Sequence, residues 1–346
     1  MSLFRFCPGP LLSALALSFF WIVPVTPSLA AKEQPMPWTM NVHFENDLFS
    51  GTDRNYTNGV KVSLISPDLV SFVESGKLPD WSLEYVYRLP FINDPDPALR
   101  RKLEFSLGQN MYTPADISRS DLIVDDRPYA GWTYLAVAFH TKSSKRMDTI
   151  ELQLGLVGPE SFADETQTAV HDLRDLDRAE GWGHQLKNEP GLAAIYERKW
   201  RLAPFVSRGS FAIDAITHLG GALGNVATYA NTGFETRLGW NLPGDFGVSL
   251  IRPAGNTGFS TSQQPGGYFF VATNGRAVLQ DIFLDGNTFT DSHSLSKRPL
   301  VADLAGGASI YLKQCKLTWT HVLRTKEFDG QTANHSFGSL SLAFFF

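Results

Sequence analysis

The last segment of the chain, residues 336–346, alternates strictly between two kinds of side chain. One set is apolar or glycine: Gly338, Leu340, Leu342, Phe344 and Phe346. The other set is mostly small or polar: Phe337, Ser339, Ser341, Ala343 and Phe345. Because successive side chains of a β-strand point to opposite faces, this pattern predicts a strand with one face in an apolar medium. A water-soluble domain seldom ends by exposing three phenylalanines in a row, so the segment favours a strand that faces lipid.

The same alternation recurs in segments 38–45, 59–64, 103–108 and 150–156. The second face of these segments carries charged residues, namely Glu45, Lys61, Glu104 and Glu151. An unpaired charge is costly in the dry core of a β-sandwich, whereas a polar barrel lumen accepts it. A closing strand that ends on an aromatic residue also resembles the assembly signal of outer-membrane barrels.

Strand candidates can be placed along the rest of the chain by the same pattern. They begin near residues 38, 57, 103, 131, 147, 191, 204, 233, 267, 300, 315 and 335. Segment 204–226 fits either one long strand or two. The predicted fold is therefore all-β: a transmembrane antiparallel up-and-down β-barrel of about twelve strands, an even number as in bacterial barrels, with a short helix in an extracellular loop.

The connections between these strands differ in length. If both termini are periplasmic, the odd-numbered connections face outside: 47–56, 112–128, 158–190, 225–232, 280–299 and 326–334. The even-numbered connections are mostly short, as expected of periplasmic turns. Two of them, 67–101 and 242–266, are long, and the sequence offers no reason for it.

The N-terminal region predicts export. Arg5, an apolar run over residues 11–23 and the small residues Ser28 and Ala30 are typical of a secretory signal peptide. We expect residues 1–30 to be cleaved and residues 31–346 to form one barrel domain; an N-terminal anchor helix is the alternative. The cleavage would remove Cys7 and leave Cys315 alone, so no intramolecular disulfide is expected. The net charge of −5 gives no support for nucleic-acid binding.

One predicted outer connection contains a cluster of oxygen-bearing side chains. Asn46, Asp47 and Asp53 offer hard oxygen ligands, which suit calcium better than zinc. A polar loop stabilised by Asx turns is the alternative. A similar group, Asp125, Asp126 and Arg127, is typical of a structural ion pair at the start of a strand.

The connection 158–190 is unusually long and includes a helical stretch at 162–180. Gln167 and His171 are four residues apart and would share one helix face, and Asp175 could orient the imidazole. A neutral histidine held in this way can take a proton from water. An ordinary surface histidine is the alternative. The sequence has neither a Gly-x-Ser-x-Gly elbow nor a His-Glu-x-x-His motif.

Several motifs, in order, carry a family resemblance: Asn46-Asp47, Tyr56-Thr57-Asn58-Gly59, 109–114, Asp126-Arg127 and the Gln167–His171 pair. Together they resemble the lipid A 3′-O-deacylase family (LpxR type). The resemblance implies a twelve-stranded barrel whose site lies between the barrel wall and an outer-loop helix, and which uses calcium and a histidine-activated water without an acyl-enzyme. It makes His171 the general base and Gln167 its helix neighbour. Asn46 and Asp47 would be the pair at the calcium site, and Thr57 the required threonine.

The chain departs from the family pattern at two places. Asp177 stands where the family has a functional glutamate, which makes it a candidate metal ligand with a shorter side chain. On a continuous helix Asp177 would point away from His171 unless the helix breaks near Gly181. The loop 115–126 contains no counterpart of the family's lysine, and Arg119 is the nearby cation. Arginine and lysine are not interchangeable at such a position.

The resemblance implies a calcium-dependent lipid A deacylase in the outer membrane of a Gram-negative bacterium. Its site would face the extracellular side, its partner would be lipid A or lipopolysaccharide, and we expect a monomer. Two other functions stay open. One is an outer-membrane phospholipase with a serine nucleophile, for which His335-Ser336 is the adjacent pair. The other is a non-catalytic pore or adhesin.

Overall fold

The computed structural model describes residues 38–47, 55–72, 76, 78–89, 92, 94, 96, 98–248, 250, 251 and 265–346. The predicted signal peptide and Asp53 lie outside these residues. No helix in the described ranges is long and apolar enough to cross a membrane.

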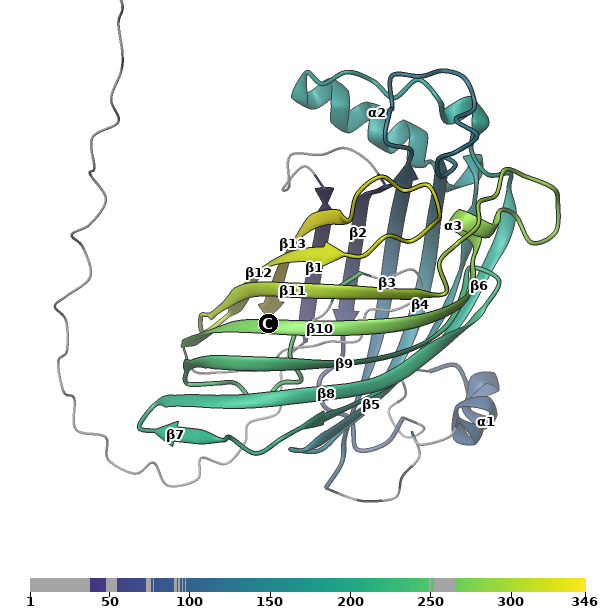
Figure 1. Ribbon diagram of the computed structural model, residues 1–346. Helices are drawn as coiled ribbons and strands as arrows, with labels where there is room; N and C mark the ends of the chain where they lie inside the picture. Colours follow the sequence, from purple (N-terminus) through teal and green to yellow (C-terminus); the bar gives the residue numbers. More distant parts are fainter. Residues whose placement is uncertain are drawn as a thin grey trace, which may run out of the picture. The chain divides into compact units, whose positions relative to one another are not determined.

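Within the described residues, twelve long antiparallel strands close into a barrel (Figure 1). The strands are β1 (Thr39–Asn46), β2 (Asn55–Ile65), β3 (Arg100–Thr113), β4 (Ala130–Lys142), β5 (Arg146–Val157), β6 (Glu189–Arg201), β8 (Phe211–Gly224), β9 (Ala227–Trp240), β10 (Gly266–Asp281), β11 (Leu300–Tyr311), β12 (Cys315–Arg324) and β13 (His335–Phe345). A short strand, β7 (Val206–Arg208), forms a hairpin with β8. Pairing of β1 with β13 and of β6 with β8 completes the ring. The predicted fold class is confirmed.

One predicted boundary is wrong, and one alternative that the sequence left open is settled. The segment 204–226, which fitted either one long strand or two, forms the two strands β7 and β8. They are separated at Gly209, whose φ of 62° is a left-handed conformation that glycine adopts at little cost. The strand expected near 233 begins at Ala227, which reduces the predicted outer loop 225–232 to a tight turn at Asn225 and Val226. The outward residues at the start of β9 are small, Ala230 and Thr232, so the apolar alternation that reveals other strands is weak there.

The two faces of the barrel wall differ as the alternation predicts. Phe105, Leu107, Leu135 and Leu154 lie on the outward face and are exposed. The inward residues include charged side chains that neutralise one another. The buried Lys61 ammonium, for example, lies 3.1 Å from a Glu151 carboxylate oxygen and 3.4 Å from one of Glu104. Mutual pairing is what makes buried charges tolerable.

We call the end at which β1, β3, β5, β8, β10 and β12 finish the loop end. It carries α2 (Ala163–Arg174) and α3 (Ile282–Asp285) (Figure 1). We call the opposite end the terminal end, where the Phe346 amide donates to the Trp38 carbonyl at 3.0 Å. The terminal end carries α1 (Asp80–Arg88).

The described part of the long connection after β9 enters the barrel lumen. Asp245 accepts hydrogen bonds from Arg237, from Tyr311 at 2.8 Å and from Lys316 at 2.9 Å. Further along, the Ile251 amide donates to the Glu45 carboxylate at 2.8 Å, on the opposite wall. We call residues 242–248, 250 and 251 the plug segment.

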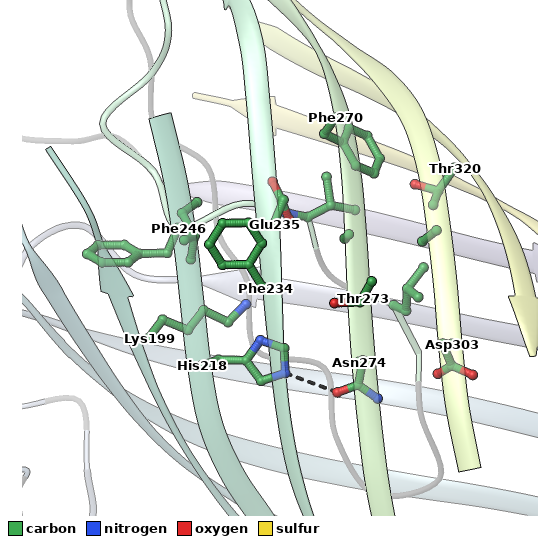
Figure 2. A pocket seen from close by; sticks show the side chains of 15 residues that line it. Lys199, His218, Phe234, Glu235, Phe246, Phe270, Thr273, Asn274, Asp303 and Thr320 are labelled. Atoms are coloured by element: carbon green, nitrogen blue, oxygen red, sulfur yellow. Dashed lines mark hydrogen bonds between the residues drawn. The ribbon is translucent and has the colours of Figure 1, made fainter. Parts of the chain in front are cut away.

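A small cavity of about 40 Å³ lies beside the plug segment (Figure 2). Its lining includes Phe246 of the plug segment, and the His218 Nε2 donates a 3.0 Å hydrogen bond to the Asn274 Oδ1 there. Polar side chains such as His218 and Asn274 therefore line the lumen even beside Phe246, the apolar residue of the plug segment.

Candidate active site at the loop end

Helix α2 lies at the loop end (Figure 1) and packs against β3 and β4, on the outward face that carries Gln109 and Gly131. The preceding short helix, η2 (Pro159–Ser161), is held by two wall side chains. Gln109 and Thr133 each donate to the Ser161 carbonyl at 2.7 Å. Gly131 allows this close approach, because a Cβ there would lie 2.1 Å from the Ser161 hydroxyl and 2.3 Å from the Ala163 methyl.

The face of α2 that meets the wall carries Ala163, Gln167 and His171, all buried. These residues are spaced four apart, which places them on one side of a helix. The predicted shared face of Gln167 and His171 is therefore present. The other faces of the helix are largely exposed.

The end of α2 differs from the prediction. The helix stops at Arg174 instead of continuing to residue 180, because Asp175 adopts a left-handed conformation with φ of 55°. The Leu176 amide then donates to the His171 carbonyl at 2.9 Å, which closes the helix as a left-handed cap does. The chain turns back toward His171 from this point. The helix therefore breaks before Gly181.

This turn positions the His171 imidazole. Its Nδ1 donates a 2.5 Å hydrogen bond to the backbone carbonyl of Asp177. The carboxylate of Asp175, which the sequence offered as the orienting group, is on an exposed residue. With Nδ1 carrying the proton, the Nε2 atom of a neutral imidazole carries the lone pair that a general base needs.

Gln167 is fixed by a residue that sequence reasoning missed. The indole Nε1 of Trp182 donates to the Gln167 Oε1 at 2.7 Å. Trp182 belongs to the short helix η3 (Trp182–His184), and its ring packs against Tyr129 with centroids 5.0 Å apart. A buried tryptophan with a polar partner is a common anchor, but nothing in the local sequence pairs it with Gln167.

The wall contributes Asn46, Thr57 and Asn58 from β1 and β2. Asn46 lies directly opposite Asn58, and Asn58 lies opposite Met111 of β3. Asn46, Asn58 and Met111 therefore share the outward face. Thr57 is the extra residue of a β-bulge between Tyr56 and Asn58. Bulges redirect single side chains, and here the Thr57 hydroxyl hydrogen-bonds that of Thr113 at 2.6 Å.

The calcium site implied by the family resemblance can be tested against these residues. Asp47 is fully buried, Asn46 is nearly so, and the Asn58 side-chain oxygen is buried without a hydrogen-bond partner in the described part of the chain. Oxygen atoms of this kind suit a hard cation. The described residues hold no group of three His, Cys, Asp or Glu side chains that could bind a metal, so amide or backbone oxygens would have to complete the shell. With that condition, the residues fit calcium.

The remaining predicted residues lie near α2 but in other arrangements. Asp177 supplies its backbone carbonyl to His171, and its side chain is on the exposed side.

Arg119 forms an ion pair with Asp121 in the loop between β3 and β4. That loop contacts the segment after α2, because the Glu180 amide donates a 2.9 Å hydrogen bond to the Ile117 carbonyl. Arg127 is buried and forms its ion pair with the distant Glu327 at 3.4 Å, not with the adjacent carboxylates that the sequence suggested.

A serine–histidine pair also occurs on this wall. The hydroxyl of Ser336 lies 3.0 Å from the Nε2 atom of His321 on neighbouring strands β13 and β12. His321 lies opposite Gly338, which lies opposite Asn46, so the pair is on the same outward face as the candidate site. The sequence pair His335-Ser336 is divided between faces, with His335 buried.

Comparisons with known proteins agree with this architecture. A family model described as "Outer membrane protein LpxR" matches residues 11–346. LpxR from Salmonella typhimurium has a similar solved structure, with a TM-score of 0.70 and 17% identity, covering 89% of this chain and 100% of that chain. The β domain of the Bordetella autotransporter Brka gives a TM-score of 0.39 at 10% identity, covering 90% of this chain and 99% of that one. A search of curated proteins gave no match. The family match across nearly the whole chain is decisive, and the chain belongs to the outer membrane protein LpxR family.

Proposed function

We propose that this outer-membrane barrel is a calcium-dependent lipid A deacylase, which hydrolyses an ester-linked acyl chain such as the 3′-acyloxyacyl group in the outer leaflet. The observation that carries the proposal is the orientation of His171. Its Nδ1 is bonded to the Asp177 carbonyl, on a helix face that lies against the outer wall of the barrel. This arrangement supports a base that acts on a membrane lipid from the side of the barrel.

The position of the site on the wall matches an amphipathic substrate. Asn46 and Asn58 stand in one outward row across neighbouring strands. The next outward row toward the membrane centre is apolar, with Phe44 opposite both Val60 and Leu340. An acyl chain lying along the apolar row would bring its ester bond to the level of the polar row. The substrate would then react without leaving the leaflet.

The reaction follows from these groups. The Nε2 atom of His171 takes a proton from water as the water oxygen bonds to the ester carbonyl carbon. When the carbon–oxygen bond to the sugar-side hydroxyl breaks, His171 returns the proton to that leaving oxygen. The products are a fatty acid and a free hydroxyl group. Asp47, Asn46 and Asn58 would hold a calcium ion, which would supply positive charge to stabilise the oxyanion.

The decisive experiment is mass spectrometry of lipid A from cells that produce the wild-type chain or a variant. The wild type is expected to remove an acyl chain, and His171→Ala is expected to leave lipid A intact. His184→Ala is the matched control, because His184 is exposed in the same connection. Chelation of calcium in isolated membranes should give the same result as His171→Ala. Unchanged lipid A with the folded wild type in calcium would refute the proposal.

The Ser336–His321 pair supports a second candidate, a serine hydrolase on the same wall. The same experiment separates the two candidates. Ser336→Ala should leave deacylation unchanged if His171 activates water directly. If Ser336→Ala abolishes hydrolysis and a fluorophosphonate probe labels Ser336 in the wild type, the serine mechanism replaces the proposal above.

A further inference from the structure

The described part of the connection between β2 and β3 covers part of the lipid-facing wall at the terminal end. Leu103, Phe139, Ile150 and Tyr196 form one outward row across β3 to β6. Leu103 is 0% exposed, although Phe105, two residues along the same face, is 42% exposed. The difference arises because Val86 of α1, together with Phe72 and Ile92, packs on this row.

The rows on either side show at which level of the wall α1 lies. On the loop-end side of the covered row, the outward residues are apolar and exposed: Phe105, Leu107, Leu135, Leu152, Leu154 and Leu192. On the other side, the next outward row contains Asp148 paired with Arg198 at 2.6 Å. A charged side chain that faces lipid is destabilising at the centre of the membrane, and this free-energy cost is smaller near the interface. Helix α1 therefore covers the last apolar row, where the apolar belt ends.

The exposed faces of α1 have the composition of an interfacial helix. Val86 is on the buried face, while Trp81 is 75% exposed and Tyr85 is 67% exposed. At 3.6 residues per turn, Tyr85 and Tyr87 flank the buried stripe on opposite sides. Trp81 lies next to Tyr85 but farther round the helix, between Tyr85 and Arg88. Glu84 and Arg88, opposite the stripe, pair with each other at 2.5 Å. Tryptophan and tyrosine concentrate at the headgroup level of membranes, where one end of the ring is apolar and the other is wet.

We propose that α1 is an interfacial anchor that inserts Trp81 and Tyr85 into the phospholipid headgroup region of the leaflet at the terminal end. The occupant of this aromatic face is phospholipid because the face continues the apolar belt of the barrel wall. The anchor fixes the depth and tilt of the barrel at this end. It depends on the barrel crossing a membrane and holds whether or not the chain hydrolyses lipid A.

Spin labels on single cysteines test the proposal in the full chain, reconstituted in vesicles of phosphatidylethanolamine and phosphatidylglycerol. Cys7 and Cys315 are first replaced by serine. Labels are placed by Trp81→Cys and Glu84→Cys on α1. Leu107→Cys on the lipid-facing wall and Lys313→Cys in the exposed turn at the same end are the references. Collision rates with oxygen, which enriches in lipid, and with a water-soluble nickel complex report the depth of each label.

The label at position 81 is expected to collide with the nickel complex about threefold less than the label at 313, and the label at 84 to fall between them. Equal nickel accessibility at 81, 84 and 313 would mean that the aromatic face is in water, as a docking surface for a protein would be, and would overturn the proposal. Because replacing Trp81 could itself weaken the insertion of α1, Tyr85→Cys, which keeps Trp81, is the second variant. If the labels in both variants are highly accessible to the nickel complex, the anchor proposal is overturned, because the loss of one aromatic side chain cannot explain both results.

Discussion

The Nδ1 atom of His171 donates to the backbone carbonyl of Asp177, six residues along the chain, at 2.5 Å. A hydrogen bond of this span is incompatible with a continuous helix. It requires the left-handed residue Asp175 between the two. The histidine is therefore oriented by backbone that the helix end positions, and the shorter side chain at position 177 does not affect this bond.

The first prediction distinguishes the Asp175 backbone from its carboxylate. Asp175→Gly removes the carboxylate but favours the left-handed conformation, so lipid A deacylation should stay near the wild-type level. Asp175→Val removes the carboxylate and strains the turn by about 1–3 kcal/mol, so deacylation should fall. Initial rates on vesicles that contain lipid A measure both. If the glycine variant loses activity as the valine variant does, the carboxylate is the orienting group after all.

A second prediction concerns acid. Two hydrogen bonds from Arg178, at 2.6 and 2.7 Å, hold the pKa of Asp172 below its ordinary value of 3.8. The ion pair therefore stabilises the turn at pH values above the ordinary pKa of 3.8. This stabilisation is lost as the pH falls through the lower pKa that Asp172 has in the folded state. Hydrogen exchange of residues 172–178 should accelerate in Asp172→Asn at pH 6 and approach the wild type at pH 3. Equal exchange of the two proteins at pH 6 would contradict the prediction.

The strands were predictable because lipid and lumen act on alternate residues everywhere along the wall. The same pattern fails where outward residues are small, as at Ala230 and Thr232. The two long connections at the terminal end were not explained, because their paths depend on distant partners. Val86 joins a hydrophobic cluster that includes Ile150, and Asp245 reaches Lys316. No local periodicity encodes such contacts.

The candidate site was predicted only in part, because the contacts of its residues also depend on structure that the local sequence does not specify. Spacing alone places Gln167 and His171 on one helix face, and the structure has them there. The partners of these residues depend on where α2 ends. Aspartate is among the few residues that tolerate a left-handed conformation, yet most aspartates do not adopt it, so the turn at Asp175 gave no clear signal. The Asp177 carbonyl and the Trp182 indole could not be assigned without that turn.

The third prediction concerns the plug segment. Asp245→Ala would leave Lys316 and Arg237 buried without this carboxylate, and breaking a buried ion pair costs about 3–5 kcal/mol. Tyr311→Phe removes one hydrogen bond to the same carboxylate and should cost about 1 kcal/mol. The temperature at which the folded barrel loses its fast gel mobility should fall most for Asp245→Ala and slightly for Tyr311→Phe. A smaller effect of Asp245→Ala would mean that the plug segment does not stabilise the lumen.

The last prediction tests whether α2 must lie close to the wall. In Gly131→Ala the new Cβ would lie 2.1 Å from the Ser161 hydroxyl and 2.3 Å from the Ala163 methyl, so the start of α2 has to move away. A displacement of about 1 Å at a reacting group can lower a rate about 100-fold. Gly183→Ala is the matched control in the connection that carries α2, because nothing lies within 4 Å of its Cβ position. Deacylation should therefore fall steeply in Gly131→Ala and stay unchanged in Gly183→Ala, while both barrels keep the wild-type unfolding temperature. Full activity in a folded Gly131→Ala barrel would show that the contact between α2 and the wall does not position His171.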